Sequence, residues 1–204
     1  MVELIVSIII VSIMTLTVYG IYTYSHSQVL NAERRSKVQN ELAFALEHMS
    51  KYAQQANGTL SRKAIQYYPD PLSPGPATGF RVYIDLNNPQ TPSNVADDGW
   101  IDYVLSSNTL AATCTANGGT CPFTPATENL TDKIISGAGG GTIMPDTDNP
   151  ADGFYFNIDA LGNVIEIGLV GRFKPTVSLT TATKLLNPQA KMKAKIVCNN
   201  ASTN

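Results

Sequence analysis

Few side chains in this 204-residue sequence have a type and spacing that suit catalysis. The two histidines, His26 and His48, fall in one predicted helix about 33 Å apart, so they cannot share a metal or a catalytic site. The glycine-rich segment 136–141 lacks the lysine of a phosphate-binding loop, and Pro145 prevents a helix directly after it. These residues favour a structural rather than a catalytic role.

One later segment gathers carboxylates that could bind a metal ion. Asp146, Asp148 and Asp152 fall within seven residues, with Asn149 between them. Oxygen ligands of this kind suit calcium, although the spacing is not that of an EF-hand. Asp, Asn, Pro and Gly are also ordinary turn residues. We therefore treat the segment as a candidate calcium site, with a plain turn as the alternative, and expect no other cofactor.

The three cysteines suggest a covalent link in an oxidising compartment. Cys114 and Cys121 bracket a short glycine-containing loop and could form a disulfide at a hairpin tip, which leaves Cys198 over. A zinc site is not expected, because this spacing is not a zinc spacing and no histidine is near in sequence. Three N-x-S/T sequons are candidate glycosylation sites whose use depends on the host: Asn57, Asn129 and Asn200.

The N-terminal residues predict a membrane helix. After Glu3, no acidic or basic side chain occurs before Glu33, and His26 is the one histidine between them. Residues 4–24 would form a helix roughly 30 Å long, the thickness of a bilayer hydrocarbon core. A secretory signal peptide is not favoured, because a basic start and a small-residue cleavage site are missing. We predict a retained membrane helix over 1–24, with the remaining chain outside.

The position of Glu3 has two explanations. An ionised carboxylate in hydrocarbon costs several kcal/mol and needs a partner. At the headgroup level it would instead be solvated and favourable at a helix N-terminus. The small and hydroxyl residues of the apolar run could permit close helix–helix approach, or could be incidental in a simple anchor: Ser7, Ser12, Thr15, Thr17 and Gly20.

The same helix is predicted to continue as an amphipathic half over 25–57, where His48 would be a surface or packing residue. No proline or glycine occurs from Ser25 to Ala56, and Asn57-Gly58 supplies a C-terminal stop. Apolar residues recur at spacings of three and four and predict one buried stripe: Val38, Leu42, Ala45, Met49, Tyr52 and Ala56. Charged residues are expected on the opposite, solvent side: Glu33, Arg34, Lys37, Glu41, Glu47 and Lys51.

The head, residues 58–204, is predicted to be rich in β-strands. The sequence Leu161-Gly162-Asn163 is expected to turn an antiparallel hairpin. Lysines alternate with apolar residues over 191–196, which is typical of a strand with one solvated face. The other runs that favour strands are 80–86, 100–105, 154–158 and 164–170. The fold class is therefore α+β, a long N-terminal helix followed by an antiparallel β-sheet head.

Charge excludes one class of partner. The formal charge is −2, and the basic residues are scattered apart from Arg34, Arg35 and Lys37. Because a nucleic-acid-binding surface needs a basic groove or stripe, we expect no nucleic-acid partner.

The N-terminal pattern resembles the type IV pilins and the pseudopilins of type II secretion systems. The resemblance is carried by Val2-Glu3-Leu4-Ile5-Val6, which looks like the family's processing and assembly motif, and by the apolar and amphipathic helix that follows. It covers residues 1 to about 56 and the head only in outline. In the family the glutamate is usually the fifth residue of the mature chain. We expect that two leading residues are missing here, the alternative being that Met1 is the processed end.

The resemblance implies a structural subunit of a type IV pilus-like extracellular filament, without enzymatic activity, that polymerises through its N-terminal helix. Its partners would be copies of itself, the inner membrane and the pilus assembly machinery, and its head could serve cell adhesion. It would lie in the inner membrane before assembly and in the extracellular filament afterwards. Glu3 would pair with the α-amine of a neighbouring subunit, which is N-methylated in the family, and the helix would locally unravel at Gly20 during assembly.

Several alternatives stay open. The resemblance makes a pairing of Cys198 with Cys114 or Cys121 credible, so the disulfide connectivity is undecided. The chain could also be a minor pilin or a type II secretion pseudopilin. A membrane-anchored periplasmic enzyme or binding domain is the alternative from another class, and it predicts a concave pocket with converging polar groups in the head.

Overall fold

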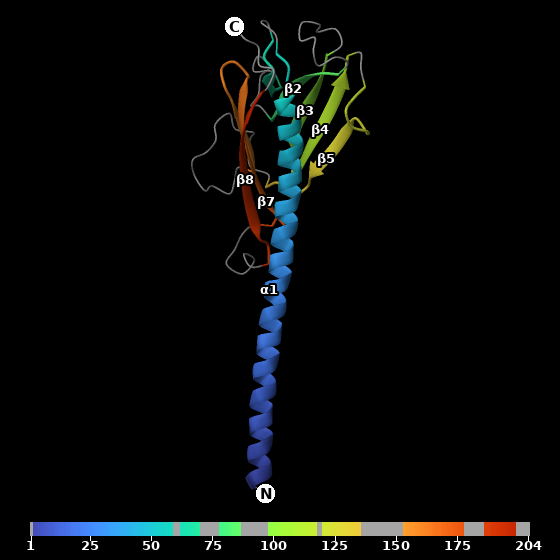
Figure 1. Ribbon diagram of the computed structural model, residues 1–204. Helices are drawn as coiled ribbons and strands as arrows, with labels where there is room; N and C mark the ends of the chain where they lie inside the picture. Colours follow the sequence, from blue (N-terminus) through green and yellow to red (C-terminus); the bar gives the residue numbers. More distant parts are fainter. Residues whose placement is uncertain are drawn as a thin grey trace.

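The computed structural model describes residues 2–58, 62–69, 78–86, 98–117, 120–135, 153–177 and 186–198. This part of the chain consists of a long helix, α1, and a β-rich head (Figure 1). The N-terminal half of α1 protrudes from the head, and its C-terminal half runs along the head. The predicted α+β class, a long N-terminal helix with an antiparallel head, is confirmed.

Helix α1 spans Val2–Gln54, which is 53 residues or about 80 Å, and it passes through Gly20 without a break. After its last residue the chain pairs with strand β2, Gly79–Asp85. Ala56 pairs with Ile84 of β2, and the N–H of Asn57 donates to the carbonyl of Tyr83 at 2.8 Å. The helix therefore stops before the predicted limit at 57, because pairing with a strand replaces its last turn.

Five strands form one antiparallel sheet in the order β1-β2-β3-β4-β5. Ser107 and Asn108 make the tight turn between β3 and β4, and Ser107 has a positive φ of 55° as such turns require. Strands β1, β4 and β5 were not predicted. The bounds are β1 Ile65–Tyr68, β2 Gly79–Asp85, β3 Asp98–Ser106, β4 Thr109–Ala116 and β5 Thr127–Thr131.

Three further strands form a second antiparallel sheet in the order β6-β7-β8. The predicted hairpin is confirmed: β6 pairs with β7, and Gly162 in the turn has a φ of 74°. The carboxylate of Asp159 closes this turn by accepting from the N–H groups of Asn163 and Val164 at 2.6 and 2.9 Å. The bounds are β6 Phe154–Ile158, β7 Val164–Arg172 and β8 Gln189–Val197.

The head thus contains two sheets where a single sheet was expected, and backbone contacts join them. Directly after β5, the carbonyl of Lys133 accepts from the N–H of Arg172 in β7 at 2.8 Å. Near the other edge of the first sheet, the N–H of Ile158 donates to the hydroxyl of Tyr67 at 3.2 Å. The two sheets therefore lie side by side, and α1 packs against β8 and β7 of one and β5 and β2 of the other.

The apolar stripe of α1 forms the centre of the core. All six residues predicted for it are buried, and Ala53 joins them. Leu42 packs onto Gly171 of β7, where an added Cβ would lie 3.0 Å from its Cδ2 atom, so the bare backbone allows the close approach. On β8 the predicted alternation is also confirmed, with exposed lysines on one face and Ala190 and Ile196 buried on the other.

We predict that Leu42→Ala lowers the free energy of unfolding of the head by about 2–5 kcal/mol, because it leaves a cavity between α1 and β7. Urea denaturation of the full chain in detergent, followed by the fluorescence of the single tryptophan Trp100, measures this change.

The matched control is Leu16→Ala, the same truncation at an exposed position of the same helix. It should change the unfolding free energy of the head by no more than about 0.5 kcal/mol. Equal destabilisation by the two variants would contradict the division of α1 into an exposed and a packed half.

Candidate functional site: the exposed half of helix α1

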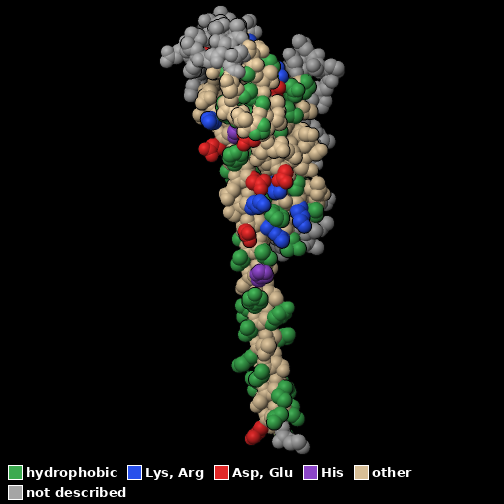
Figure 2. All heavy atoms as spheres, turned by 90° about the vertical axis from the view of Figure 1, so that its right-hand side faces the viewer, with side chains coloured by type: hydrophobic (Ala, Val, Ile, Leu, Met, Phe, Trp, Pro, Cys, Tyr) green, Lys and Arg blue, Asp and Glu red, His purple; other side chains and the backbone are tan. Residues whose placement is uncertain are grey.

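The N-terminal half of α1 is an apolar surface that no other described part of the chain covers. Every residue from Val2 to Val29 is exposed, and Figure 2 shows this part of the helix standing free of the head. By length and composition, α1 is the one helix among the described residues that could cross a membrane. Each large apolar side chain buried there would contribute roughly 1.5–3 kcal/mol. The surface therefore requires lipid or other protein around it.

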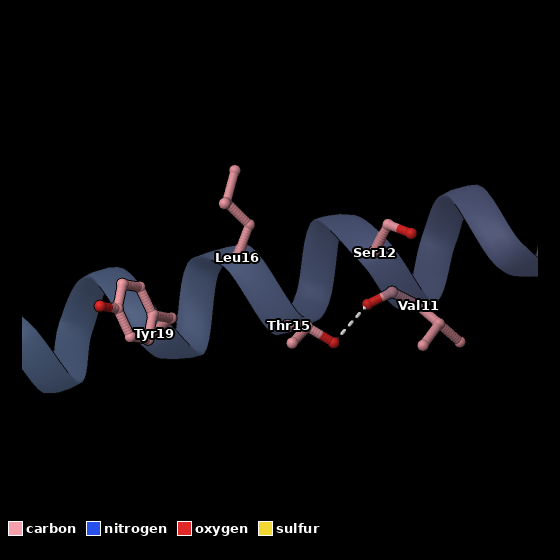
Figure 3. A pocket seen from close by; sticks show the side chains of 5 residues that line it. All are labelled: Val11, Ser12, Thr15, Leu16 and Tyr19. Carbon is pink, nitrogen blue, oxygen red and sulfur yellow. Dashed lines mark hydrogen bonds between the residues drawn. The ribbon is translucent and has the colours of Figure 1, made fainter.

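Five hydroxyl groups on this surface, four of them in its apolar part, are bonded within the helix. Ser12 donates to the carbonyl of Ile8 at 2.7 Å. Thr15 donates to the carbonyl of Val11 at 2.8 Å (Figure 3). Thr17, Thr23 and Ser27 bond to the preceding turn in the same way. A hydroxyl that is already bonded can enter hydrocarbon or a helix interface at small cost.

A shallow groove on this surface is lined by small and large side chains in turn. Ser12 and Thr15 lie between Val11, Leu16 and Tyr19 (Figure 3). The groove is open and belongs to one helix, so it is unsuited to hold a small substrate. Small residues between large ones instead allow the ridge of another helix to approach.

The two predicted assembly residues lie on this half of α1. Glu3 is exposed in the first helical turn, where a carboxylate interacts favourably with the helix dipole. Gly20 is helical, and an added Cβ would meet nothing within 4 Å in the subunit. The pairing of Glu3 with a neighbouring amine and the unravelling at Gly20 concern an assembled state and stay predictions.

Aromatic residues mark the end of the apolar half nearest the head. The rings of Tyr22 and His26 are stacked, with centroids 6.2 Å apart, and Tyr19 and Tyr24 are exposed nearby. Tyrosine is enriched where a membrane span meets water. These rings therefore lie where the predicted membrane segment ends, at residue 24.

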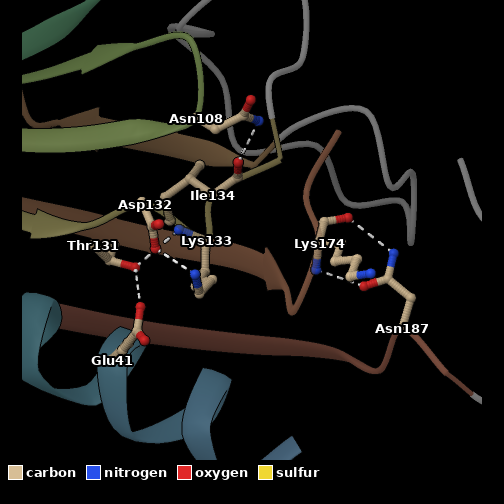
Figure 4. A network of polar contacts seen from close by, with 8 residues as sticks. All are labelled: Glu41, Asn108, Thr131, Asp132, Lys133, Ile134, Lys174 and Asn187. Atoms are coloured by element: carbon tan, nitrogen blue, oxygen red, sulfur yellow. Dashed lines mark hydrogen bonds and ion pairs between the residues drawn. The ribbon is translucent and has the colours of Figure 1, made fainter. Parts of the chain in front are cut away.

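Two charged residues of α1 that were predicted to face solvent instead hold the head. The carboxylate of Glu41 accepts from the hydroxyl of Thr131 at 3.1 Å, and that hydroxyl accepts from the N–H of Lys133 at 3.1 Å (Figure 4). Arg34 donates to the carbonyl of Leu186 at 2.9 Å. The prediction for Arg34 and Glu41 was wrong, because the head covers more of the helix circumference than the apolar stripe alone.

His48 is a packing residue where α1 meets β3 and β5. Its Nδ1 atom lies 3.2 Å from the hydroxyl of Tyr103, and its Nε2 atom lies 3.7 Å from the carboxylate of Glu128. The ring of Phe123 meets it edge-on with centroids 5.4 Å apart. Burial lowers the pKa of His48 despite the opposing effect of Glu128, which favours the neutral imidazole in the folded head.

The disulfide joins Cys114 and Cys121, which resolves the alternatives that the sequence left open. Cys198 is a free thiol, buried near the carbonyl of Gly162. Burial, with a smaller effect of Asp159, raises the pKa of the Cys198 thiol to about 11. The disulfide therefore closes a loop of the head and does not attach the C-terminal segment.

The predicted glycosylation and calcium sites differ in exposure, and some of them lie outside the described residues. Asn129 is exposed on β5, whereas Asn57 is only 2% exposed, so a glycan on Asn57 does not fit the folded head. Asn200 and the candidate calcium residues Asp146, Asp148 and Asp152 lie outside the described residues. Among the residues that the structure describes, no group of three or more His, Cys, Asp or Glu side chains is arranged to hold a metal.

Comparisons with known proteins add little. No protein-family model matches the sequence, and no curated protein matches it significantly. Among solved structures, the chain is similar to a type IV-like pilin from Thermus thermophilus, with 11% identity and a TM-score of 0.40 over 80% of this chain and 98% of that chain. A likeness at this level carries no conclusion about function.

We predict that acidification weakens the head through His48. Because its pKa is lowered in the fold, the stabilisation from neutral His48 is fully present above its ordinary value of 6.5 and is lost as the pH falls below it. Urea denaturation midpoints at about pH 7.5 and about pH 5.5 measure the loss.

In His48→Gln, which cannot titrate, the difference between the two midpoints should be smaller. Carboxylates that titrate in both proteins cancel in this comparison. An identical pH response of the two proteins would show that His48 does not titrate in this range.

We predict that a thiol reagent finds no reactive cysteine in the native chain, one after unfolding, and three after unfolding with a reductant. The reason is the burial and raised pKa of Cys198. Mass spectrometry of the alkylated protein counts the modified residues. Modification of Cys114 or Cys121 in the unfolded, unreduced chain would contradict the observed pairing.

Proposed function

We propose that this chain is a pilin-like structural subunit, anchored in the inner membrane by the first half of α1 and polymerising through that half into an extracellular filament. The main observation behind this proposal is that one uninterrupted helix has an exposed half and a half that is packed against the head. Residues 2–29 are exposed and largely apolar, while the stripe from Val38 to Ala56 is buried under the head.

The continuity of the helix favours a polymer over a simple tether. An anchor for a separate domain needs only about 20 apolar residues and can be followed by any linker. Here the same helix continues from the apolar half into the hydrophobic core of the head. The apolar half therefore has a fixed direction and rotation relative to the head. Repeated head-to-tail contacts in a helical filament require such a fixed relation.

The exposed surface itself supports the same proposal. The hydroxyl groups of Ser12 and Thr15 are bonded within the helix, and these small residues leave an open groove between Val11 and Tyr19. These features suit first lipid and then the helices of other subunits, since neither environment offers water to an unbonded polar group. The transfer between them keeps the apolar surface covered at both stages.

Glu3 has a defined role in this proposal. Its carboxylate stands at the end of a surface that carries no other charge before Glu33. In lipid such a charge is costly, so an incoming subunit that supplies a positively charged α-amine is stabilised where it docks. The acid therefore directs the position of the new subunit, while the apolar residues supply the cohesion.

We predict that Glu3→Ala and Glu3→Gln each abolish fibres that contain this chain, because neither retains the charge that attracts the amine. Negative-stain imaging and immunolabelling of material sheared from cells that produce the chain provide the measurement. The control is Glu33→Gln, which removes an exposed carboxylate beyond the apolar half and should leave the fibres intact.

Two outcomes would argue against parts of this proposal. Fibres that persist in Glu3→Gln would refute the role of the acid but not the polymer. If no fibre contains the unmodified chain and the protein stays in the membrane fraction, the result would refute the filament proposal and support a membrane-anchored domain instead.

A further inference from the structure

The end of the head that faces the protruding helix carries a group of basic side chains. Arg34 is held there by the carbonyl of Leu186 and lies with its guanidinium carbon 5.2 Å from the centre of the Phe173 ring. Arg35 and Lys37 follow on the same helical turns and are exposed. Figure 2 shows Lys and Arg side chains gathered at this lower end of the head, on the face in view.

Lys174, two residues after the end of β7, completes the group. Its backbone is clamped by Asn187, whose Oδ1 atom accepts from the N–H of Lys174 at 2.7 Å and whose Nδ2 atom donates to its carbonyl at 2.9 Å (Figure 4). The clamp holds Lys174 next to Phe173, at the level of Arg34. We call Arg34, Arg35, Lys37 and Lys174 the basic collar.

Acidic side chains and some apolar surface lie beside the collar (Figure 2). Glu33 is exposed on the same turn of the helix, Glu41 accepts a hydrogen bond from Thr131, and the exposed carboxylate of Asp132 is paired with Lys133. Leu186, at the same level, is 57% exposed. Basic side chains with a neighbouring apolar one suit the boundary between water and lipid headgroups.

The geometry of α1 sets the distance from the collar to a membrane. From Tyr24, where the charge-free segment ends, to Arg34 is about 15 Å along the helix, of which the headgroup layer takes roughly 5–8 Å. The remaining gap is within about one Debye length at physiological salt. Helical side chains also point toward the N-terminus, so Arg34, Arg35 and Lys37 are directed toward the membrane.

We infer that the basic collar is a docking surface for anionic lipid headgroups, which holds the head of the unassembled subunit down on the membrane. The inference rests on the proposed anchoring of the first half of α1 and goes beyond it, because an anchor alone requires no contact of the head with lipid. A modest tilt of the helix brings one side of the collar into the headgroup layer. Extraction of the subunit into a filament would then release this contact.

The test uses the full chain reconstituted into vesicles of phosphatidylcholine, with or without phosphatidylglycerol. Hydrogen exchange, read by mass spectrometry, follows the backbone amides of the two segments at the collar, which are those of Phe173, Lys174, Thr176, Val177, Leu186 and Asn187. We expect exchange in these segments to slow by roughly twofold or more in the vesicles with anionic lipid at low salt, and to recover at high salt.

Two matched double variants distinguish a specific effect of the collar from a general effect of positive charge on the head. Lys37→Gln/Lys174→Gln should lose the protection, whereas Lys51→Gln/Lys195→Gln should retain it. Each pair removes one exposed lysine from α1 and one from the second-sheet side of the head, and the second pair lies farther from the membrane. Equal loss in both pairs, or equal protection in the two kinds of vesicle, would overturn the inference.

Two further outcomes have distinct meanings. Protection that grows with protein density and ignores lipid charge would show that a second copy of the chain covers the collar, and would overturn the lipid contact. If the chain fails to float with vesicles of either composition, the anchoring premise and the inference fall together. Flotation without charge-dependent protection refutes the inference alone.

Discussion

The whole architecture depends on the backbone hydrogen bonding of α1, because one helix must be stable in two different surroundings. In the packed half, the sheets stabilise the helix by burying its stripe. In the exposed half no other described part of the chain packs against it, so stability there comes from propagation out of the half that is already formed. Every residue added in this way satisfies its own backbone groups, which is the condition for surrounding it with hydrocarbon.

The head depends on the helix as much as the helix depends on the head. Its two sheets meet through backbone and hydroxyl contacts, such as Arg172 with Lys133 and Ile158 with Tyr67, and through the ring of Phe80, which contacts the rings of Phe154 and Phe156. The buried stripe of α1 belongs to the same hydrophobic cluster as the inward residues of both sheets. Without the helix, these inward faces would be exposed to water. The head and the packed half of α1 therefore form one cooperative unit in which the helix is the shared layer.

The periodic features of this fold could be predicted from the sequence, whereas the features set by contacts between distant segments could not. The stripe from Val38 to Ala56 repeats a simple spacing, and all of it is buried. Arg34 and Glu41 lie at the margin of that stripe, and only the extent of the surrounding sheets decides whether they meet solvent or protein. Strand β4 was missed because small and threonine side chains give a weak apolar signal. The sequon at Asn57 is buried because the backbone after the helix is hydrogen-bonded to β2. No local sequence pattern indicates this long-range contact.

The long contact between α1 and the head also determines how the subunit bears mechanical load. Within α1 the buried stripe runs from Val38 to Ala53, about 22 Å parallel to the helix axis, and beyond it the backbone of Asn57 is hydrogen-bonded to β2. A pull along the axis loads these contacts together in shear, since the helix can slide only if all of them give way. A sideways force would peel the helix from its free end, one contact after another. The subunit should therefore resist tension along α1 much better than bending across it.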